Sequence, residues 1–207
     1  MTRTFGADKS LDEERLVAAA QRGDVNAFNQ LVLAYQQMAY NVAYRILSNP
    51  DAAMDATQDA FLRGFQGLSR FRGGSFRAWV LRIVTNCSYD QLRYKQRRPS
   101  ASIDDLVEEE EHSTLLQSDD EAPEDYIERR ELSRELQQAM DSLPEDQRLT
   151  LILSDIEGLN YQEIAETTLV SLGTVKSRLS RARAKMRDCI RAQRELGATG
   201  RRLSDES

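Results

Sequence analysis

The side chains best suited to chemistry in this chain are basic and hydroxyl groups near its C-terminus, where residues 170–194 hold eight Lys or Arg and one acidic residue. At the roughly 100° per residue of a helix, an apolar stripe and a polar face separate over this segment. The stripe consists of Leu172, Val175, Leu179, Ala182 and Met186. The polar face carries Thr174, Ser177, Arg178, Arg181 and Lys185. Such hydroxyl and cationic groups hydrogen-bond to phosphates and base edges, so the pattern favours a helix that reads the major groove of DNA.

A short helix is predicted just before this segment, because Asn160 and Glu163 have the spacing of a capping box. The residues expected to face inward from it are Tyr161, Ile164 and Ala165. Residues 167–171 are about the right length for the turn of a helix–turn–helix, which would span residues 160–187. From this segment alone, the alternative is a surface helix with a solvated basic face.

The sequence shows no residue pattern that would support catalysis or metal binding. We find no nucleophile–base set, no phosphate-binding loop and no paired carboxylates in a plausible cleft, so an enzyme is not expected. His112 stands alone, and Cys87 and Cys189 are far apart, so we expect no metal and no cofactor. Without a long apolar run or a visible secretory signal, we expect a cytoplasmic protein with reduced thiols and no membrane insertion.

The net charge of −6 alone would argue against nucleic-acid binding, but the charges are segregated along the chain. Residues 1–98 carry 14 basic and 9 acidic side chains, a balance of +5. Residues 99–130 carry 2 and 12, a balance of −10, and residues 131–207 carry 12 and 13. A local basic stripe matters more for phosphate binding than the charge of the whole chain.

Helical periodicity dominates the chain, and no segment shows the alternation of a strand. In the first half we predict helices from Ser10 to about Arg22, after Asp24 to about Leu47, from Pro50 to about Gly67, and after Ser75 to about Arg98, with residues 69–75 as a loop. In the second half we predict a helix from about Tyr126 through Met140 and another from Pro144.

These elements predict an all-α fold with two small helical domains. The first would span residues 11–98 and the second residues 130–192, joined by an acidic flexible linker at 99–129 whose composition cannot bury enough apolar surface to fold alone. Residues 193–207 are predicted to be a disordered tail.

Two sets of sequence motifs closely resemble the extracytoplasmic-function (ECF) group of the sigma-70 family. In the second half, Ser142–Arg148, Gly158–Glu166 and Gly173–Arg183 resemble sigma region 4. In the first half, Asp55–Phe61 resembles region 2.2, and Phe71–Trp79 with Arg82–Asn86 resembles regions 2.3 and 2.4. The resemblance covers about residues 12–98 and 130–190. Two motif sets in the right order are much more specific than one helix–turn–helix.

The resemblance implies an alternative sigma factor that binds core RNA polymerase and directs initiation at promoters with −35 and −10 elements. Region 2.2 would bind the clamp helices of the β′ subunit through Asp55, Gln58, Asp59 and Phe61. For Phe61, ordinary core packing is the alternative. An anti-sigma factor is also expected as a partner.

Regions 2.3 and 2.4 would open and bind the −10 element, which requires an unstacked base, a pocket and cationic contacts to the backbone. The residues assigned to this role are Phe71, Arg72, Gly73, Gly74, Ser75, Arg77, Trp79, Arg82 and Asn86. Trp79 also lies on the apolar stripe of its helix, so core packing and base stacking remain alternatives for it.

Region 4 would read the −35 element in the major groove and contact the β flap. The residues assigned to DNA are Ser171, Thr174, Lys176, Ser177, Arg178, Arg181 and Lys185. Members of the family usually have a glycine in the turn, often followed by a proline, where this chain has Leu169 and Ser171. The turn is therefore expected to hold a non-glycine residue at a strained angle, or to follow a different path.

Two further interpretations stay open at the level of sequence. The acidic linker either occupies a basic channel of polymerase that later receives RNA, or serves as a solvated spacer. An ordinary helix–turn–helix regulator would explain residues 160–187 but not the motifs of the first half. The basic face argues against a third interpretation, a helical adaptor. A degenerate sigma factor that only binds an antagonist stays open as an alternative.

Overall fold

The computed structural model describes residues 7–97 and 123–204, and every regular element within those ranges is a helix. The all-α prediction is thereby confirmed. None of the described helices is both long and apolar enough to cross a membrane. Residues 99–122 of the predicted linker, with Glu108–Glu111 and His112, lie outside the described residues. The described chain forms two compact units, one containing residues 7–97 and 153–171 and the other residues 123–152 and 172–204.

The first unit is built on α1 (Ala7–Gln21), α2 (Val25–Leu47), α3 (Pro50–Gly67) and α4 (Phe76–Arg97), with the 3₁₀ turn η1 (Leu68–Arg70) between the last two. Two predicted N-caps are confirmed. The Asp24 carboxylate accepts from the backbone N–H groups of Asn26 and Ala27, and the Asn49 side chain accepts from that of Ala52. These bonds satisfy donors that a helix start leaves without intrahelical partners. The predicted start of the first helix at Ser10 is wrong, because α1 begins at Ala7.

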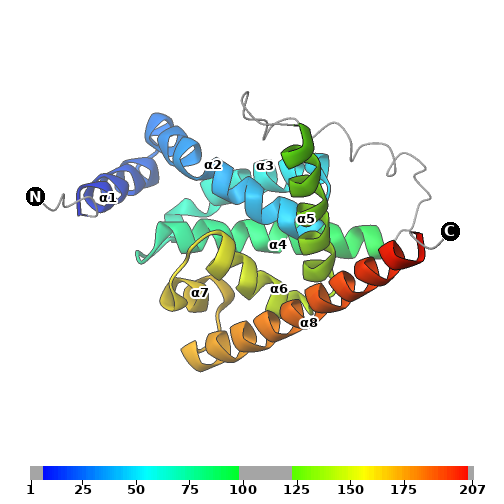
Figure 1. The fold of residues 1–207 in the computed structure, drawn as a ribbon. Coiled ribbons are helices and arrows are strands. Elements are labelled where there is room, and N and C mark those ends of the chain that lie inside the picture. Colours follow the sequence, from blue (N-terminus) through cyan, green and yellow to red (C-terminus); the bar gives the residue numbers. More distant parts are fainter. Residues whose placement is uncertain (1–6, 98–122, 205–207) are drawn as a thin grey trace, which may run out of the picture. The chain divides into compact units, whose positions relative to one another are not determined.

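The core of this unit lies where α2, α3 and α4 pack on one another (Figure 1). Much of the surface that α2 and α3 bury is alanine, which allows helix axes to approach closely. The buried alanines of these two helices are Ala27, Ala39, Ala43, Ala53, Ala56 and Ala60. Larger side chains fill the remaining space, among them Leu31, Val42, Ile46, Phe76, Leu81 and Val84. Packing of this kind turns three marginal helices into one rigid frame.

The short helix α7 (Tyr161–Thr168) belongs to the same unit and contacts α4. Its N-terminus carries the predicted capping box, in which the Asn160 side chain accepts from the Gln162 and Glu163 N–H groups and Glu163 accepts from the Asn160 N–H. The buried Thr167 hydroxyl donates its single hydrogen to the Glu163 carbonyl at 2.8 Å, and its oxygen also lies 3.4 Å from the Ala78 carbonyl oxygen of α4. A polar contact and a local cap thus hold α7 in place.

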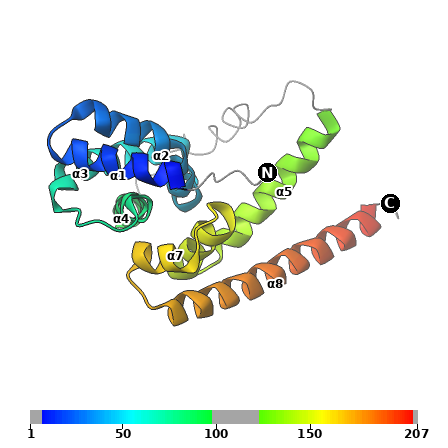
Figure 2. The ribbon, with the colours of Figure 1, turned by 90° about the vertical axis from the view of Figure 1, so that its left-hand side faces the viewer.

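The second unit consists of α5 (Pro123–Asp141), α6 (Glu145–Leu151) and α8 (Leu172–Ser204). A π-helical turn, η4 (Ile152–Ile156), follows α6 in the chain, and its residues from Leu153 onward belong to the first unit. Both α5 and α6 pack on α8, the long helix seen in Figure 2. The shared core includes Ala139, Met140, Leu143, Leu149, Ile152, Val175, Leu179 and Ala182. All three inner residues of the predicted stripe on α8 are therefore buried, whereas Leu172 at its start is 43 % exposed.

Two predicted boundaries of this unit differ from the structure. α5 begins at Pro123, so residues 123–129 are helical rather than part of a flexible linker; proline at a first helical position costs little because its missing N–H would have no partner there. α8 continues to Ser204, so residues 193–204 are not a disordered tail. Three Arg and two Leu favour its extension, two Gly disfavour it, and adding residues to an existing helix is easier than starting one.

The turn after α7 contains the strained residue that the sequence indicates. Leu169 adopts φ 55° and ψ 40°, the left-handed conformation, and its N–H donates to the Ala165 carbonyl. Its side chain is 72 % exposed, so little burial compensates for the backbone strain. In L-residues this conformation brings Cβ close to the following carbonyl oxygen, at a cost of roughly 1–2 kcal/mol.

Replacing Leu169 with glycine should therefore stabilise the protein by about 1 kcal/mol, because glycine removes the strain while the extra freedom of the unfolded chain takes back part of the gain. Thermal unfolding followed by circular dichroism measures the change. Gly158 is the matched control, since its φ of 66° lies in the same region, and Gly158→Ala should lower the unfolding temperature. A lower unfolding temperature for Leu169→Gly would contradict the assignment of strain.

Candidate nucleic-acid interface

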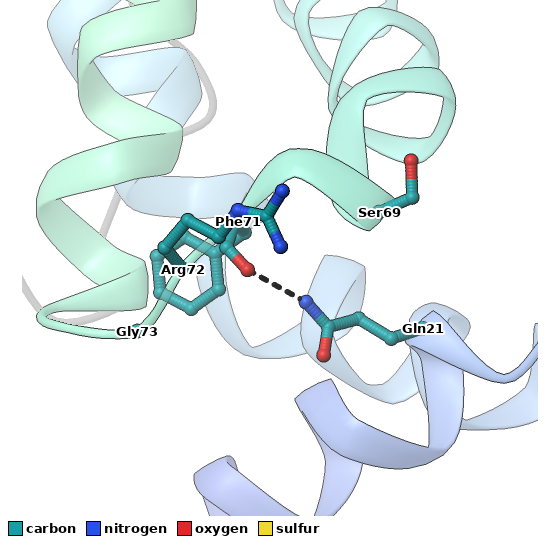
Figure 3. Close-up of a pocket in the computed structure, with 5 residues that line it drawn as sticks. All are labelled: Gln21, Ser69, Phe71, Arg72 and Gly73. Atoms are coloured by element: carbon teal, nitrogen blue, oxygen red, sulfur yellow. Dashed lines mark hydrogen bonds between the residues drawn. The ribbon is translucent and has the colours of Figure 1, made fainter.

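An open pocket of about 520 Å³ lies beside the loop that joins η1 to α4. Figure 3 shows its lining, which comes from the end of α1, from η1 and from the loop: Gln21, Ser69, Phe71, Arg72 and Gly73. A volume of this size is within the roughly 300–1,000 Å³ of typical ligand pockets. The loop residues assigned to DNA from the sequence thus meet at a hollow surface, and the Arg72 side chain is exposed there.

Aromatic rings anchor the ends of this loop. The Phe71 ring lies edge-on to Phe76, with ring centroids 5.7 Å apart, and packs on Trp79 at 5.3 Å. Phe76 is almost completely buried and also contacts the ring of Tyr35. Tyr35 donates a hydrogen bond to Glu13, and burial together with this bond raises the pKa of its phenol. The rings therefore fix where the loop leaves η1 and where it enters α4.

Trp79 is explained mainly by packing, although it is only half-buried. A Cβ placed on Gly64 or Gly67 of α3 would lie 3.7–3.9 Å from the Trp79 ring, so these glycines make the surface on which the indole rests. Core packing, one of the two alternatives left by the sequence, thus accounts for its position. The partly exposed ring still borders the loop through its contact with Phe71.

The middle of the loop has an unusual backbone conformation. Gly73 and Gly74 have φ values of 95° and 89°, which side chains other than glycine rarely tolerate. No atom lies within 4 Å of a Cβ placed on either glycine. The glycines are therefore required by the backbone turn and not by a close neighbour, and they leave open space above the loop.

The arginines and the asparagine predicted on α4 have different surroundings. Asn86 is exposed and Arg82 is half-buried. Arg77 instead donates to the Glu157 carbonyl at 2.6 Å and to the Met38 sulfur at 3.3 Å, and it lies 3.7 Å from the Glu163 carboxylate. In this structure the 157–163 segment holds the Arg77 guanidinium. Sequence spacing does not reveal a partner 80 residues away.

The outward face of α3 carries the predicted polymerase-binding residues. Asp55, Gln58 and Asp59 are exposed, and Phe61 is half-buried. Two apolar side chains that the sequence analysis did not assign lie among them, Met54 at 50 % and Leu62 at 62 % exposure. Ala53 is fully buried. The helix therefore exposes a mixed acidic and apolar surface, of the kind that protein partners bind.

On α8, the predicted DNA-binding residues fall into two groups. The exposed ones are Ser171, Lys176, Ser177, Arg181 and Lys185, while Thr174 and Arg178 are half-buried. Arg178 pairs with Asp146 of α6, with Nε and Oδ2 2.9 Å apart, and the Lys185 ammonium donates to the Ser142 carbonyl at 2.9 Å. The outward face predicted from periodicity is therefore partly occupied by contacts within the second unit, and Arg181 is its exposed arginine.

The two cysteines of the chain differ in accessibility. Cys87 lies buried on the inner side of α4, and burial raises the pKa of its thiol. Cys189, on α8, is partly exposed. Among the described residues no group of three or more His, Cys, Asp or Glu side chains is arranged to hold a metal ion.

Two residues of the pocket lining, Gln21 and Ser69, are not among those assigned from the sequence, and Gln21 makes long-range contacts. Its side-chain amide donates to the carbonyls of Leu68 and Phe71, at 3.0 and 2.8 Å. These partners are 47 and 50 residues away along the chain, so no local spacing rule reveals them.

Comparison with known proteins agrees with this arrangement. Family models match "Sigma-70 region 2" over residues 31–98 and "Sigma-70, region 4" over residues 133–186. The pocket, the aromatic cluster and the α3 face all fall in the first match or at its border, and the basic part of α8 falls in the second. This order of matches is the one the sequence motifs predict.

Individual relatives place the chain more narrowly. It is 36 % identical to the ECF RNA polymerase sigma-E factor of Escherichia coli (strain K12), over 84 % of this chain and 92 % of that protein. It is also 36 % identical to the ECF RNA polymerase sigma factor SigE of Mycolicibacterium smegmatis, over 84 % of this chain, which spans 65 % of that longer relative. CnrH, solved in complex with the cytosolic domain of CnrY, has a TM-score of 0.66 and 25 % identity, covering 87 % of this chain and 98 % of CnrH. The chain therefore belongs to the ECF group of the sigma-70 family of transcription initiation factors.

Glu157 yields a prediction about the segment that holds Arg77. Burial raises the pKa of its carboxyl above the usual 4.5, although Arg77, Asn41 and Arg45 act in the opposite direction, and its Oε1 atom is buried without a hydrogen-bond partner. A raised folded-state pKa means that the charged form destabilises the fold. This cost is absent below the unfolded pKa and appears as pH rises through the folded pKa.

Glu157→Gln should accordingly stabilise the protein at pH 7, by up to about 1 kcal/mol, and the gain should disappear below about pH 4. Urea unfolding at several pH values measures it. The exposed Glu14 provides a control with the same charge change, and Glu14→Gln should leave stability nearly unaltered. A gain for Glu157→Gln that stays constant down to pH 3 would contradict the proposed titration.

Proposed function

We propose that this chain acts as an ECF-type sigma factor whose two halves divide the work of promoter recognition. The exposed face of α3 binds core RNA polymerase, the loop at 71–75 with α4 captures and opens the −10 element, and α8 anchors the −35 duplex. The polymerase performs nucleotide transfer, and this chain supplies recognition without catalysis. The protein would act where its polymerase is, in the cytoplasm.

The observation that carries the proposal is the structure of the loop at 71–75 beside the pocket, which has anchored ends and an exposed middle. Its ends are anchored by ring contacts to the buried Phe76, whereas Arg72, Gly73 and Gly74 are exposed above open space. Capture of single-stranded DNA requires a cavity, an aromatic border and a cation near the backbone. Arg82 and Asn86 extend this surface along α4, so the −10 assignment rests on Phe71–Ser75 and these two residues, with Trp79 as a border and Arg77 held elsewhere.

Docking on polymerase is assigned to the mixed surface of α3. Asp55, Gln58 and Asp59 would meet basic or hydrogen-bonding groups of the β′ clamp helices, while Met54 and Leu62 would bury apolar area. A surface that combines apolar side chains with surrounding charges suits a protein partner better than DNA, because carboxylates repel phosphates. Phe61, half-buried, supports the helix and contributes its exposed edge.

The N-terminal half of α8 is assigned to the −35 element. Ser171, Thr174, Lys176, Ser177 and Arg181 lie on the first turns of the helix or just before it, where recognition helices contact base edges. Lys185 and Arg178 would act chiefly at the border of this surface. Residues near the apolar side of the second unit would contact the β flap.

Control by a protein antagonist is part of the proposal. The relative CnrH was solved with the cytosolic domain of another protein bound to it. We expect an anti-sigma factor for this chain as well, one that covers the polymerase-binding and DNA-binding surfaces.

In vitro transcription tests the function directly. Bacterial core polymerase with the purified chain should initiate at a defined subset of promoters in a genomic library, and core polymerase alone should not. Mapping the 5′ ends of the transcripts gives the −35 and −10 sequences. Tight binding of the chain to duplex DNA without polymerase, combined with no specific initiation, would instead support an ordinary helix–turn–helix regulator.

Arg178 and Arg181 lie on the same predicted face of α8, but only Arg178 forms an ion pair with Asp146 of α6. Arg181→Ala should weaken initiation that depends on the −35 element by about tenfold or more, the effect of losing 1–3 kcal/mol of DNA contact, without loss of stability. Arg178→Ala should lower stability by less than about 1 kcal/mol, because its ion pair is partly exposed. Transcription from promoters with intact and altered −35 elements, together with thermal unfolding, measures both.

Asp146→Asn is the matched control, because it breaks the ion pair but keeps Arg178. It should reproduce the loss of stability and leave DNA binding intact. If Arg181→Ala has no effect on initiation while Arg178→Ala abolishes it at unchanged stability, the assignment of the two arginines is wrong.

A further inference from the structure

Gln21 makes the contact between α1 and the loop that borders the pocket. Its Nε2 group donates one hydrogen to the Leu68 carbonyl at 3.0 Å and one to the Phe71 carbonyl at 2.8 Å. Figure 3 shows the second of these bonds. The orientation of the amide follows from its partners, since two carbonyl oxygens can only accept. A single side chain therefore ties together the start of η1 and the first residue after it.

The position of Gln21 is itself determined by the end of its helix. α1 ends at Gln21, and two residues later Gly23 adopts φ 96°, a conformation typical of a residue that terminates a helix. The Arg22 and Gly23 N–H groups donate to Ala19 and Ala20. Asp24 then caps α2. Helix ends on both sides thus hold the Gln21 side chain over the loop.

The loop has few other constraints at this end. The Phe71 N–H donates to the Leu68 carbonyl, closing η1, and the Phe71 ring rests on Phe76 and Trp79. Beyond Phe71, a Cβ placed on Gly73 or Gly74 would meet no atom within 4 Å, so neither position makes a side-chain contact with the rest of the fold. The direction in which Arg72 and the glycines leave η1 therefore depends on how the Phe71 carbonyl is held.

We infer that Gln21 is a positioning residue for recognition of the −10 element: by holding the Leu68 and Phe71 carbonyls, it presets the loop and the shape of the pocket that receives the opened strand. The inference rests on the proposed function of the loop. A preset loop pays less ordering entropy when DNA binds, and it distinguishes a fitting base from an ill-fitting one more sharply. Gln21 influences recognition indirectly, by holding the loop in place. It lies on α1, outside the sequence motifs that mark the DNA-binding regions.

Gln21→Glu is the sharpest test, because it keeps the shape of the side chain but replaces the donating amide by a carboxylate that two carbonyls repel. At promoters defined by the wild-type protein, discrimination between the preferred −10 sequence and single-base variants should fall by roughly tenfold, equivalent to about 1.4 kcal/mol. Fluorescence of 2-aminopurine placed in the −10 element should show less unstacking. Binding to core polymerase and discrimination at the −35 element should not change.

Three comparisons keep the outcome decisive. Gln21→Met, neutral and of similar length, should show the same loss, which separates the missing donor from the added charge. Gln30→Glu places the same charge on an exposed site of α2 and should behave as wild type. Hydrogen exchange of the free protein should be faster at residues 68–75 in both Gln21 variants.

Two results would overturn the inference. If both Gln21 variants retain −10 discrimination within twofold, the residue does not position the loop. If they lose core binding, −35 discrimination and thermal stability in parallel, Gln21 is merely structural. Failure of the wild-type protein to initiate at any promoter would contradict the proposed function itself, and is distinguishable because it appears before any Gln21 variant is made.

Discussion

The close packing of α3 against α4 is the constraint on which the rest of the first unit depends. Buried alanines and Gly64 keep the facing side of α3 small, and the Trp79 ring lies directly on this glycine surface. Because the two helices are held this closely, the acidic face of α3, the loop and the polar face of α4 form parts of one rigid body. A contact made at one of these surfaces therefore orients the others.

Hydrogen bonds between distant segments then determine how the exposed groups are used. Asp146 holds Arg178 against α6, and Glu157 and Glu163 hold Arg77 on α4. In each case a cation that the sequence offers to DNA has a carboxylate or carbonyl partner inside its own unit. The basic side chains therefore differ in how available they are to DNA. In the proposed function, the exposed Arg72 and Arg181 contribute more to recognition than the paired Arg77 and Arg178.

The parts predicted correctly from sequence depend on local rules. The caps at Asp24, Asn49 and Asn160 bond to backbone groups two or three residues away, so their spacing is visible in the sequence. Leu169 is another local case, because the position after a helix usually needs a left-handed residue. The family and the order of its two regions follow from motifs that are likewise continuous in sequence.

The missed parts depend on contacts between distant residues or on cooperative helix growth. Gln21 and Arg77 have partners far away in the chain, which no periodicity encodes. The polar composition of residues 123–129 and 193–204 predicts disorder, but both segments are helical. A helix that has already started extends through residues of ordinary helix propensity. The residues assigned to each predicted surface therefore lie together in the structure, whereas the sequence does not show which of their side chains are already held by other groups.

The unequal burial of the two thiols has a practical consequence. A thiol reacts as its thiolate, and Cys87 combines a raised pKa with an inaccessible position in the core, whereas Cys189 is partly exposed on α8. Because the chain has only these two cysteines, a maleimide dye at neutral pH will attach to Cys189 in the folded protein. The natural sequence thus provides a single labelling site on the long helix, from which distances to polymerase or promoter can be followed by fluorescence without first removing a cysteine.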